Sequence, residues 1–167
     1  MNQEYDALLV ASGRKFLLKG NEGMSLSQKN SICVDGIEAH QKISKILPKI
    51  KSLVLINLNH DSLNVANTIR KEFPQIGITI IDKNDNLESL TREVGEEVAK
   101  GIIAEHKKNG VKFILGNLPL FVYGEEEEKK RLMFHKGEEL ETDLILAFPE
   151  IFKGTKVVPL VFIKGIP

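Results

Sequence analysis

Short apolar segments rich in β-branched residues alternate along the chain with longer segments of helical period. The apolar segments, such as SLVLINL and GITIID, are nearly continuous in hydrophobic residues and therefore predict strands that are covered on both faces. Strands that alternate with helices in this way are typical of β-α units and of a parallel sheet. The predicted strands are residues 5–11, 52–58, 77–82, 111–116, 143–148 and 156–163.

Two of the intervening segments carry start signals for helices. Residues 61–73 place their apolar residues on one stripe, with Asp61 as the expected N-cap and a proline directly after the last turn. Residues 85–109 have apolar residues at three- and four-residue spacing, and Asp85 followed by Glu88 forms a capping-box pattern. We expect this second segment to be the longest helix.

Three further segments are less regular. Residues 37–50 have a clear helical period, which predicts a helix opened by Asp35 and disturbed near Pro48. Residues 12–30 contain three glycines around a short apolar run, so this segment is a hairpin or an irregular loop, with the hairpin favoured. Residues 125–136 place four glutamates before a basic cluster, which favours a short exposed helix over an acidic binding patch.

These elements predict a Rossmann-like α/β domain with three layers and a mainly parallel sheet of about five to six strands. A chain of 167 residues has the length of one ordinary domain. Neither a repeat nor a linker divides it. We therefore expect residues 1–167 to form a single domain.

Charge and composition narrow the classes of function. Lysine plus arginine and aspartate plus glutamate balance at 23 each, which argues against nucleic acid as a partner, because non-specific binding to nucleic acid needs a positive field. Cys33 is the only cysteine, so an intrachain disulfide and a multi-cysteine zinc site are excluded. No apolar run has the length of a membrane span, and the acidic N-terminus does not resemble a signal peptide. We expect a cytoplasmic protein without a membrane partner.

Several motifs of nucleotide-dependent and hydrolytic enzymes are missing from the sequence. The chain has neither the G-x-x-x-x-G-K-[ST] phosphate loop nor a G-x-G-x-x-G turn after a strand, so ATP hydrolysis and ordinary dinucleotide binding are disfavoured. It also lacks the G-x-S-x-G nucleophile motif and the H-E-x-x-H zinc pair. The four histidines are scattered along the chain, and the sequence indicates no metal site and no particular cofactor.

Ligands of open parallel sheets bind at the carboxyl ends of the strands, where loops meet helix N-termini. The polar and glycine residues that follow the predicted strands are therefore the candidate ligand-binding residues. They are Ser12, Gly13, Arg14, Asn57, Asn59, His60, Asp61, Asp82, Gly116 and Asn117.

The turn at 57–62 has the highest density of polar groups. Its backbone N–H groups open a helix, and histidine, the residue at position 60, is a common acid or base, so the turn could bind a phosphate or carboxylate group or take part in acid–base chemistry. Structural roles explain the same residues, because Asp61 would cap the helix and the asparagines would satisfy the backbone of the turn. Arg14 and Asp82 have structural alternatives too, as a hairpin residue and a helix-capping residue.

Three functional hypotheses follow. The first, which we favour, is a binding or regulatory domain for a small anionic molecule, such as a nucleotide, at residues 57–61. The second is a small enzyme that uses His60 with Asp61 or Asp82 as acid and base. The third is an assembly subunit without a ligand, for example a homodimer, joined through a sheet edge or through residues 157–163.

Overall fold

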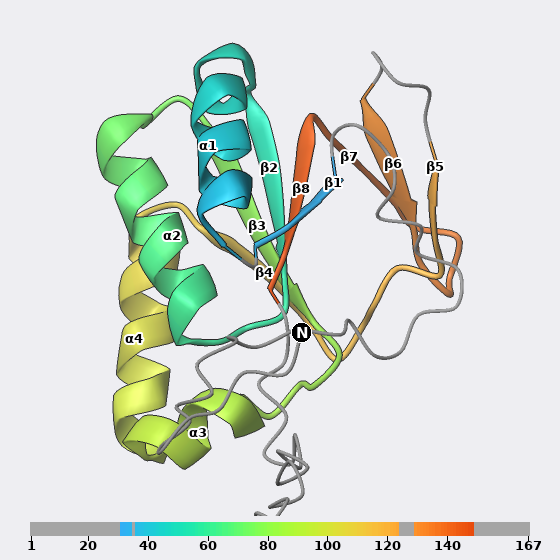
Figure 1. Cartoon of the computed structure of the whole chain (residues 1–167). Coiled ribbons are helices and arrows are strands. Elements are labelled where there is room, and N and C mark those ends of the chain that lie inside the picture. Colours follow the sequence, from blue (N-terminus) through green and yellow to red (C-terminus); the bar gives the residue numbers. More distant parts are fainter. Residues whose placement is uncertain (1–30, 35, 124–128, 149–167) are drawn as a thin grey trace, which may run out of the picture.

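The computed structural model describes residues 31–34, 36–123 and 129–148, and its centre is a parallel sheet (Figure 1). Within these residues the sheet has five strands in the order β1-β8-β2-β3-β4, and every neighbouring pair is parallel. This arrangement confirms the expected Rossmann-like α/β fold. The strands are β1 (Ser31–Cys33), β2 (Ser52–Ile56), β3 (Gly77–Asp82), β4 (Lys112–Leu115) and β8 (Leu144–Ala147).

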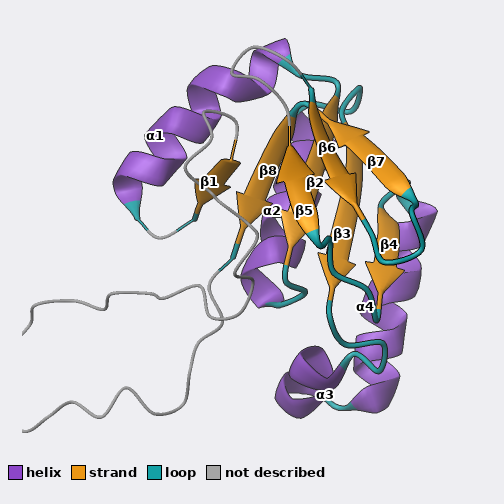
Figure 2. Ribbon diagram, turned by 90° about the vertical axis from the view of Figure 1, so that its right-hand side faces the viewer, coloured by secondary structure: helices purple, strands orange, loops and turns teal. Residues whose placement is uncertain are grey.

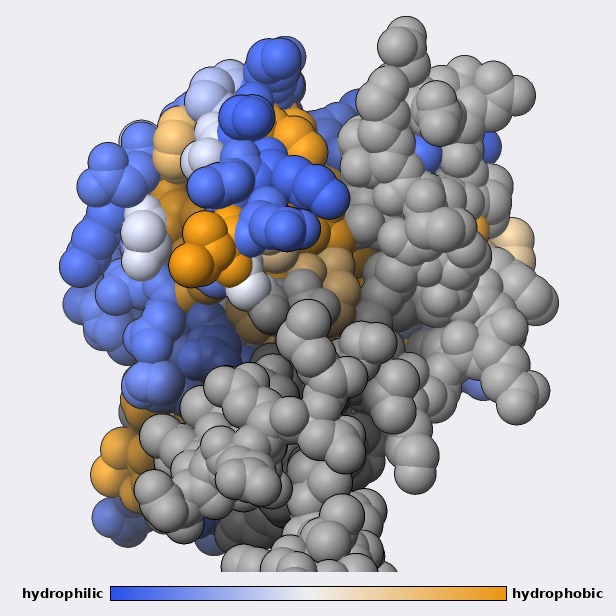
Figure 3. All heavy atoms as spheres, viewed as in Figure 1, coloured by the Kyte–Doolittle hydropathy of each residue, from blue (hydrophilic) through white to orange (hydrophobic). Residues whose placement is uncertain are grey.

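Helices cover one face of the sheet (Figures 1 and 2). Apolar residues of the helices, such as Ala66 and Ile103, belong to one buried cluster with Leu53, Leu55 and Ile80 of the strands. The outward surfaces of the helices are mainly hydrophilic (Figure 3), as expected for amphipathic helices. The helices are α1 (Ile37–Ile46), the short 3-10 helix η1 (Leu47–Lys49), α2 (His60–Glu72), α3 (Glu88–Val94) and α4 (Glu96–Lys108).

A second, antiparallel sheet covers the opposite face (Figure 1). Its strands are β5 (Phe121–Tyr123), β6 (Lys130–Met133) and β7 (Glu139–Thr142), in the order β5-β6-β7. Side chains alternate along β2, so that Leu53 and Leu55 face the helices while Val54 and Ile56 belong to a cluster with the antiparallel sheet. The other members of this second buried cluster are Ile81, Val122, Leu132, Phe134, Ile145 and Ala147. The molecule therefore has the three layers predicted, with an antiparallel sheet as one outer layer.

Most of the predicted strands are confirmed. The strands predicted at 52–58, 77–82, 111–116 and 143–148 are present, with ends that differ by at most two residues. β1 was not predicted, because its three residues are too few to show a period. Residues 5–11, 12–30 and 156–163, for which we predict two strands and a hairpin, lie outside the described residues.

The prediction of one long helix at 85–109 is wrong, because the chain turns at Gly95. This residue has a φ of 85° and separates α3 from α4. Glycine adopts a positive φ without the steric strain that other residues meet. The capping box of Asp85 and Glu88 does not form either, since the N–H of Glu88 donates to the Asn86 side chain over 3.1 Å.

The predicted exposed helix at 125–136 is also wrong in the part that the structure describes. Lys130–Met133 form β6, which pairs with both β5 and β7. Lys130 and Leu132 are buried, and Phe134 continues the same alternation. A period of two is that of a strand, and the burial of this face outweighs the weak charge pairs that favoured a helix.

The disturbance predicted near Pro48 is confirmed. α1 ends at Ile46, and Pro48 lies at the start of the 3-10 turn η1 that follows. Proline fits the first turn of a helix because its missing N–H is not needed there. Asp35, the residue predicted to open α1, lies outside the described residues.

Two broader expectations concern the chain as a whole. No helix within the described residues combines the length and the apolar character of a membrane-spanning segment. That residues 1–167 form a single domain stays a prediction.

Candidate functional site

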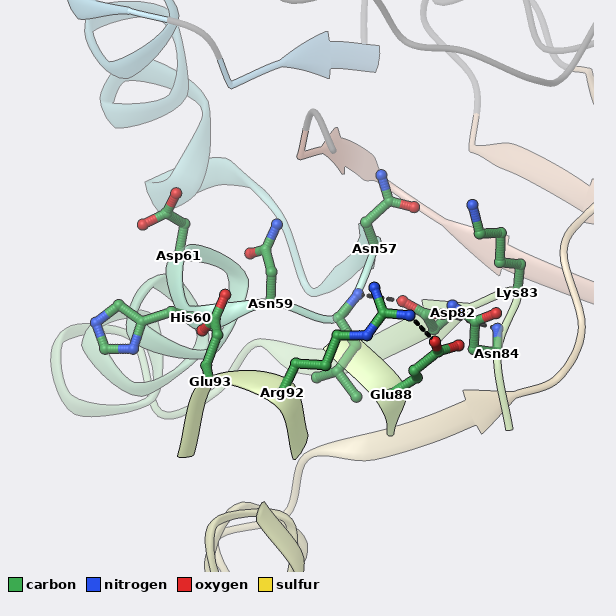
Figure 4. A pocket seen from close by; sticks show the side chains of 11 residues that line it. Asn57, Asn59, His60, Asp61, Asp82, Lys83, Asn84, Glu88, Arg92 and Glu93 are labelled. Carbon is green, nitrogen blue, oxygen red and sulfur yellow. Dashed lines mark hydrogen bonds and ion pairs between the residues drawn. The ribbon is translucent and has the colours of Figure 1, made fainter. Parts of the chain in front are cut away.

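The carboxyl ends of β2 and β3 border an open pocket of about 590 Å³ (Figure 4). The chain runs from β2 through β3 to β4 on one side, and β8 then joins β2 on the other side, so the strand order reverses between β2 and β8. Ligands of doubly wound sheets bind next to such a reversal. The pocket is lined by Asn57, Leu58, Asn59, His60, Asp61, Asp82, Lys83, Asn84, Glu88, Arg92 and Glu93.

Asn57 connects the ends of β2, β3 and β8. Its N–H donates to the carbonyl of Ile81 over 2.9 Å, and its side-chain amide donates to the carbonyl of Phe148. Asn57 has a φ of 77°, a left-handed conformation that asparagine tolerates better than most residues and that glycine adopts without strain. The Asn57 side chain therefore links the ends of β2 and β8, the two strands between which the strand order reverses.

Asn59, and not Asp61, caps α2. The Asn59 Oδ1 accepts the N–H of Ser62 over 2.9 Å, and the Ser62 hydroxyl accepts the N–H of Asn59 over 3.0 Å. This reciprocal pair is a capping box. Asp61 lies within the first turn, where its negative charge suits the helix dipole. The prediction of Asp61 as the cap was wrong because Asn59 has the extended backbone of a capping residue.

Asp82 is buried at the end of β3 and braces the turn after β2. One carboxylate oxygen accepts the N–H of Leu58 over 2.6 Å, and the other accepts the N–H of Asn84 over 2.7 Å. The Asp82 side chain still lines the pocket. A carboxylate has about four lone-pair positions, so Asp82 keeps the capacity to accept further hydrogen bonds from a ligand.

The formal charge of the pocket lining is negative. The lining has two cationic and four carboxylate side chains, a net of −2 with histidine neutral, from Lys83, Arg92, Asp61, Asp82, Glu88 and Glu93. Arg92 forms an ion pair with Glu88 one helical turn away. This balance favours a neutral or weakly charged ligand over a strongly anionic one, because like charges repel.

His60 is exposed at the edge of the pocket. Figure 4 shows its ring on the opposite side of the pocket from Asp82. Both carboxylate oxygens of Asp82 accept backbone N–H groups instead. The geometry therefore gives no support to His60 and Asp82 as an acid–base pair.

The structure brings together five of the ten candidate residues that the sequence indicates, namely Asn57, Asn59, His60, Asp61 and Asp82. Gly116 and Asn117 lie nearby without lining the pocket, and the N–H of Asn117 donates to the Asp82 carbonyl over 3.2 Å. Ser12, Gly13 and Arg14 lie outside the described residues, as do residues 157–163 of the assembly hypothesis. Whether any of these residues binds a ligand stays a prediction.

Sequence reasoning missed six pocket residues. They are Leu58, Lys83, Asn84, Glu88, Arg92 and Glu93. Lys83 and Asn84 directly follow Asp82, so extending the strand end by two residues would have included them. The remaining charged residues belong to α3, whose position under the pocket depends on the break at Gly95.

Comparisons with known proteins identify the fold of the chain but assign it to no family. No family model matches the chain, and no curated protein matches it. Solved structures do match. They include a water-forming NADH oxidase from Lactobacillus brevis bound to NADH (TM-score 0.69, 16% identity, 86% of this chain and 30% of that chain). A ferredoxin reductase from Rhodopseudomonas palustris (TM-score 0.66, 16% identity, 75% and 30%) and a putidaredoxin reductase in covalent complex with putidaredoxin (TM-score 0.68, 23% identity, 81% and 32%) also match.

These similarities establish a shared Rossmann-type fold. The chain spans about a third of the length of each of these proteins. In Rossmann-type dinucleotide sites, the turn between the first strand and helix carries G-x-G-x-x-G, and an acidic residue follows about 20 residues later. In this chain Asn57, Asn59 and Ser62 have the spacing of the three glycines, and Asp82 follows Ser62 by 20 residues.

Proposed function

We propose that this chain is a binding domain for a nucleoside or nucleotide, held in the pocket with its ribose hydroxyls on Asp82. The observation that supports the proposal most directly is that Asp82, at the end of β3, lines the same pocket as the turn between β2 and α2. In Rossmann-type sites an acidic residue at this place accepts the hydroxyls of a ribose. A free pair of vicinal hydroxyls fits the acceptor capacity of Asp82.

The turn adds polar groups beside the ribose position. The side chains of Asn59 and Asn84 line the pocket and supply amide donors and acceptors for a base. The N–H groups of His60 and Asp61 open α2, where a single phosphate would find positive partial charge. The similar fold of the NADH-bound oxidase is consistent with a nucleotide ligand.

A ligand series tests the proposal on the full chain. We expect adenosine and AMP to raise the melting temperature saturably, by about 5 °C or more at 100 times the dissociation constant. 2′,3′-Dideoxyadenosine is the matched control, because it keeps the base and lacks the hydroxyls. We expect it to bind about tenfold more weakly, a difference of about 1.4 kcal/mol. Equal binding of adenosine and the dideoxy compound would contradict the assigned role of Asp82.

A further inference from the structure

The group that this fold most often binds is a dinucleotide, and the turn between β2 and α2 tests whether one fits. In dinucleotide sites the first glycine allows the tight turn, the second lets the backbone approach the pyrophosphate, and the third lets the helix pack closely on the strand. Here all three positions carry side chains, namely those of Asn57, Asn59 and Ser62.

At the first position, the Asn57 backbone keeps the left-handed conformation of a glycine. Its side chain, however, donates a hydrogen bond to the Phe148 carbonyl at the end of β8. The crevice between β2 and β8 is where a Rossmann-type sheet opens to receive its ligand. The Asn57 side chain thus links the turn after β2 to the end of β8, on the side where the strand order reverses.

At the second and third positions, side chains accept hydrogen bonds from backbone N–H groups of the turn. The N–H of Ser62 donates to the Asn59 side chain, and the N–H of Asn59 donates to the Ser62 hydroxyl. Ser62 is fully buried, so its hydroxyl cannot leave this pair without an alternative partner. Two N–H groups of the turn are thus satisfied within the protein, and the second position, where a glycine would let a pyrophosphate approach the backbone, carries an asparagine side chain.

The charge of the pocket also disfavours the binding of a pyrophosphate. A pyrophosphate carries about two negative charges, and the lining itself has a net formal charge of −2. Arg92, one of the two cations, forms an ion pair with Glu88. A neutral nucleoside meets no such repulsion.

We propose that this pocket takes a nucleoside without a pyrophosphate, and that Asn57, Asn59 and Ser62 exclude NAD-type dinucleotides. The proposal rests on the proposed function for the nucleoside part of the ligand. Its other part, the exclusion of dinucleotides by the turn, is tested separately.

The experiment measures the binding of adenosine, ADP-ribose and NADH to the full chain by titration calorimetry. We expect the natural chain to bind adenosine at least tenfold more tightly than ADP-ribose or NADH. In the variant with Asn57→Gly, Asn59→Gly and Ser62→Gly, we expect the affinity for ADP-ribose and NADH to rise at least tenfold. Asn109→Gly is the matched control, since it removes an exposed asparagine at the end of α4, outside the pocket, and should leave NADH binding unchanged.

A second variant keeps the test decisive if the triple variant does not fold. Asn59→Gly alone places glycine at the N-cap of α2, a position at which glycine is common. It frees the N–H of Ser62 and should raise the affinity for NADH severalfold. Circular dichroism establishes that each variant is folded.

Each outcome separates the two proposals. Binding of NADH to the natural chain as tightly as adenosine overturns the exclusion and leaves nucleotide binding standing. If the natural chain binds none of the compounds, the proposed function fails, and a gain of NADH binding by the glycine variants still supports the exclusion. Folded glycine variants without any gain overturn it.

Discussion

The carboxylate of Asp82, at the end of β3, accepts the backbone N–H of Leu58, in the turn after β2, over 2.6 Å. Its second oxygen accepts the N–H of Asn84 over 2.7 Å. One buried side chain thus fixes two loops of the candidate site, and Figure 4 shows it beside Asn84, on the opposite side of the pocket from His60. The same residue therefore supports the fold and lines the pocket.

Replacing Asp82 with asparagine should destabilise the protein. One side of the new amide can only donate, so it cannot accept both backbone N–H groups and leaves one of them unsatisfied. We expect a loss of about 1–2 kcal/mol in the free energy of unfolding, measured with urea. Asp85→Asn, at an exposed carboxylate three residues later, is the control and should change stability by less than about 0.5 kcal/mol. Equal effects of the two substitutions would show that the Asp82 hydrogen bonds do not stabilise the fold.

Asn59→Ala should destabilise α2, because alanine cannot accept the N–H of Ser62. The expected loss is about 1 kcal/mol in the free energy of unfolding. Asn59→Asp keeps the acceptor and should retain most of the stability. A chain in which both substitutions are neutral would place the cap elsewhere, for instance at Asp61 as the sequence first indicated.

Two glycines of the chain should respond to alanine in opposite directions. Gly116 has a φ of 72°, and an added Cβ would lie 3.0 Å from the Cβ of Asp85, so Gly116→Ala should destabilise by more than about 1 kcal/mol. Gly101 lies inside α4 with open space around it, so Gly101→Ala should stabilise by about 0.5–1 kcal/mol. Denaturation midpoints of the two variants measure both effects, and a stabilising Gly116→Ala would contradict the left-handed turn after β4.

Asp143 should make the stability of the sheet dependent on pH. Partial burial acts to raise the pKa of Asp143, but hydrogen bonds from the Lys51 N–H and from the hydroxyl and N–H of Ser52, with the charge of Lys129, hold this pKa below its ordinary value of 3.8. A carboxylate whose pKa is lowered by folding stabilises the folded state above the pKa of the unfolded chain. This contribution is lost as the pH falls through the lower folded pKa.

The comparison of the natural chain with Asp143→Asn measures this contribution. We expect the natural chain to be the more stable at about pH 7, and the difference in unfolding free energy to shrink at about pH 2.5. A difference that stays constant over this range would show that the charge of Asp143 does not contribute.

The central sheet could be predicted from sequence because its main strands have a clear hydrophobic pattern. β2 and β3 are buried on both faces, and such strands are nearly continuous in apolar residues. The candidate site followed from the same reasoning, since the rule that ligands bind at strand ends led directly to Asn57, Asn59 and Asp82. These three residues can be identified without knowledge of the strand order.

The antiparallel layer could not be predicted in the same way. Its strands are three or four residues long, and β6 lies in a highly charged segment whose helical charge spacing hides the alternation of Lys130, Leu132 and Phe134. The break at Gly95 was hidden as well, because the apolar period continues across it. In both cases long-range packing decides between local patterns of similar strength.

The position of β8 has a consequence for how the chain folds. β8 lies between β1 and β2, and directly before β8 the Asp143 carboxylate accepts the N–H of Ser52, 91 residues earlier in the chain. Until β8 has been synthesised, β1 lacks its neighbour and β2 has an open edge that can pair with other chains. Contacts of such sequence separation form slowly, so the ribosome must release nearly all of the described residues before the sheet can close.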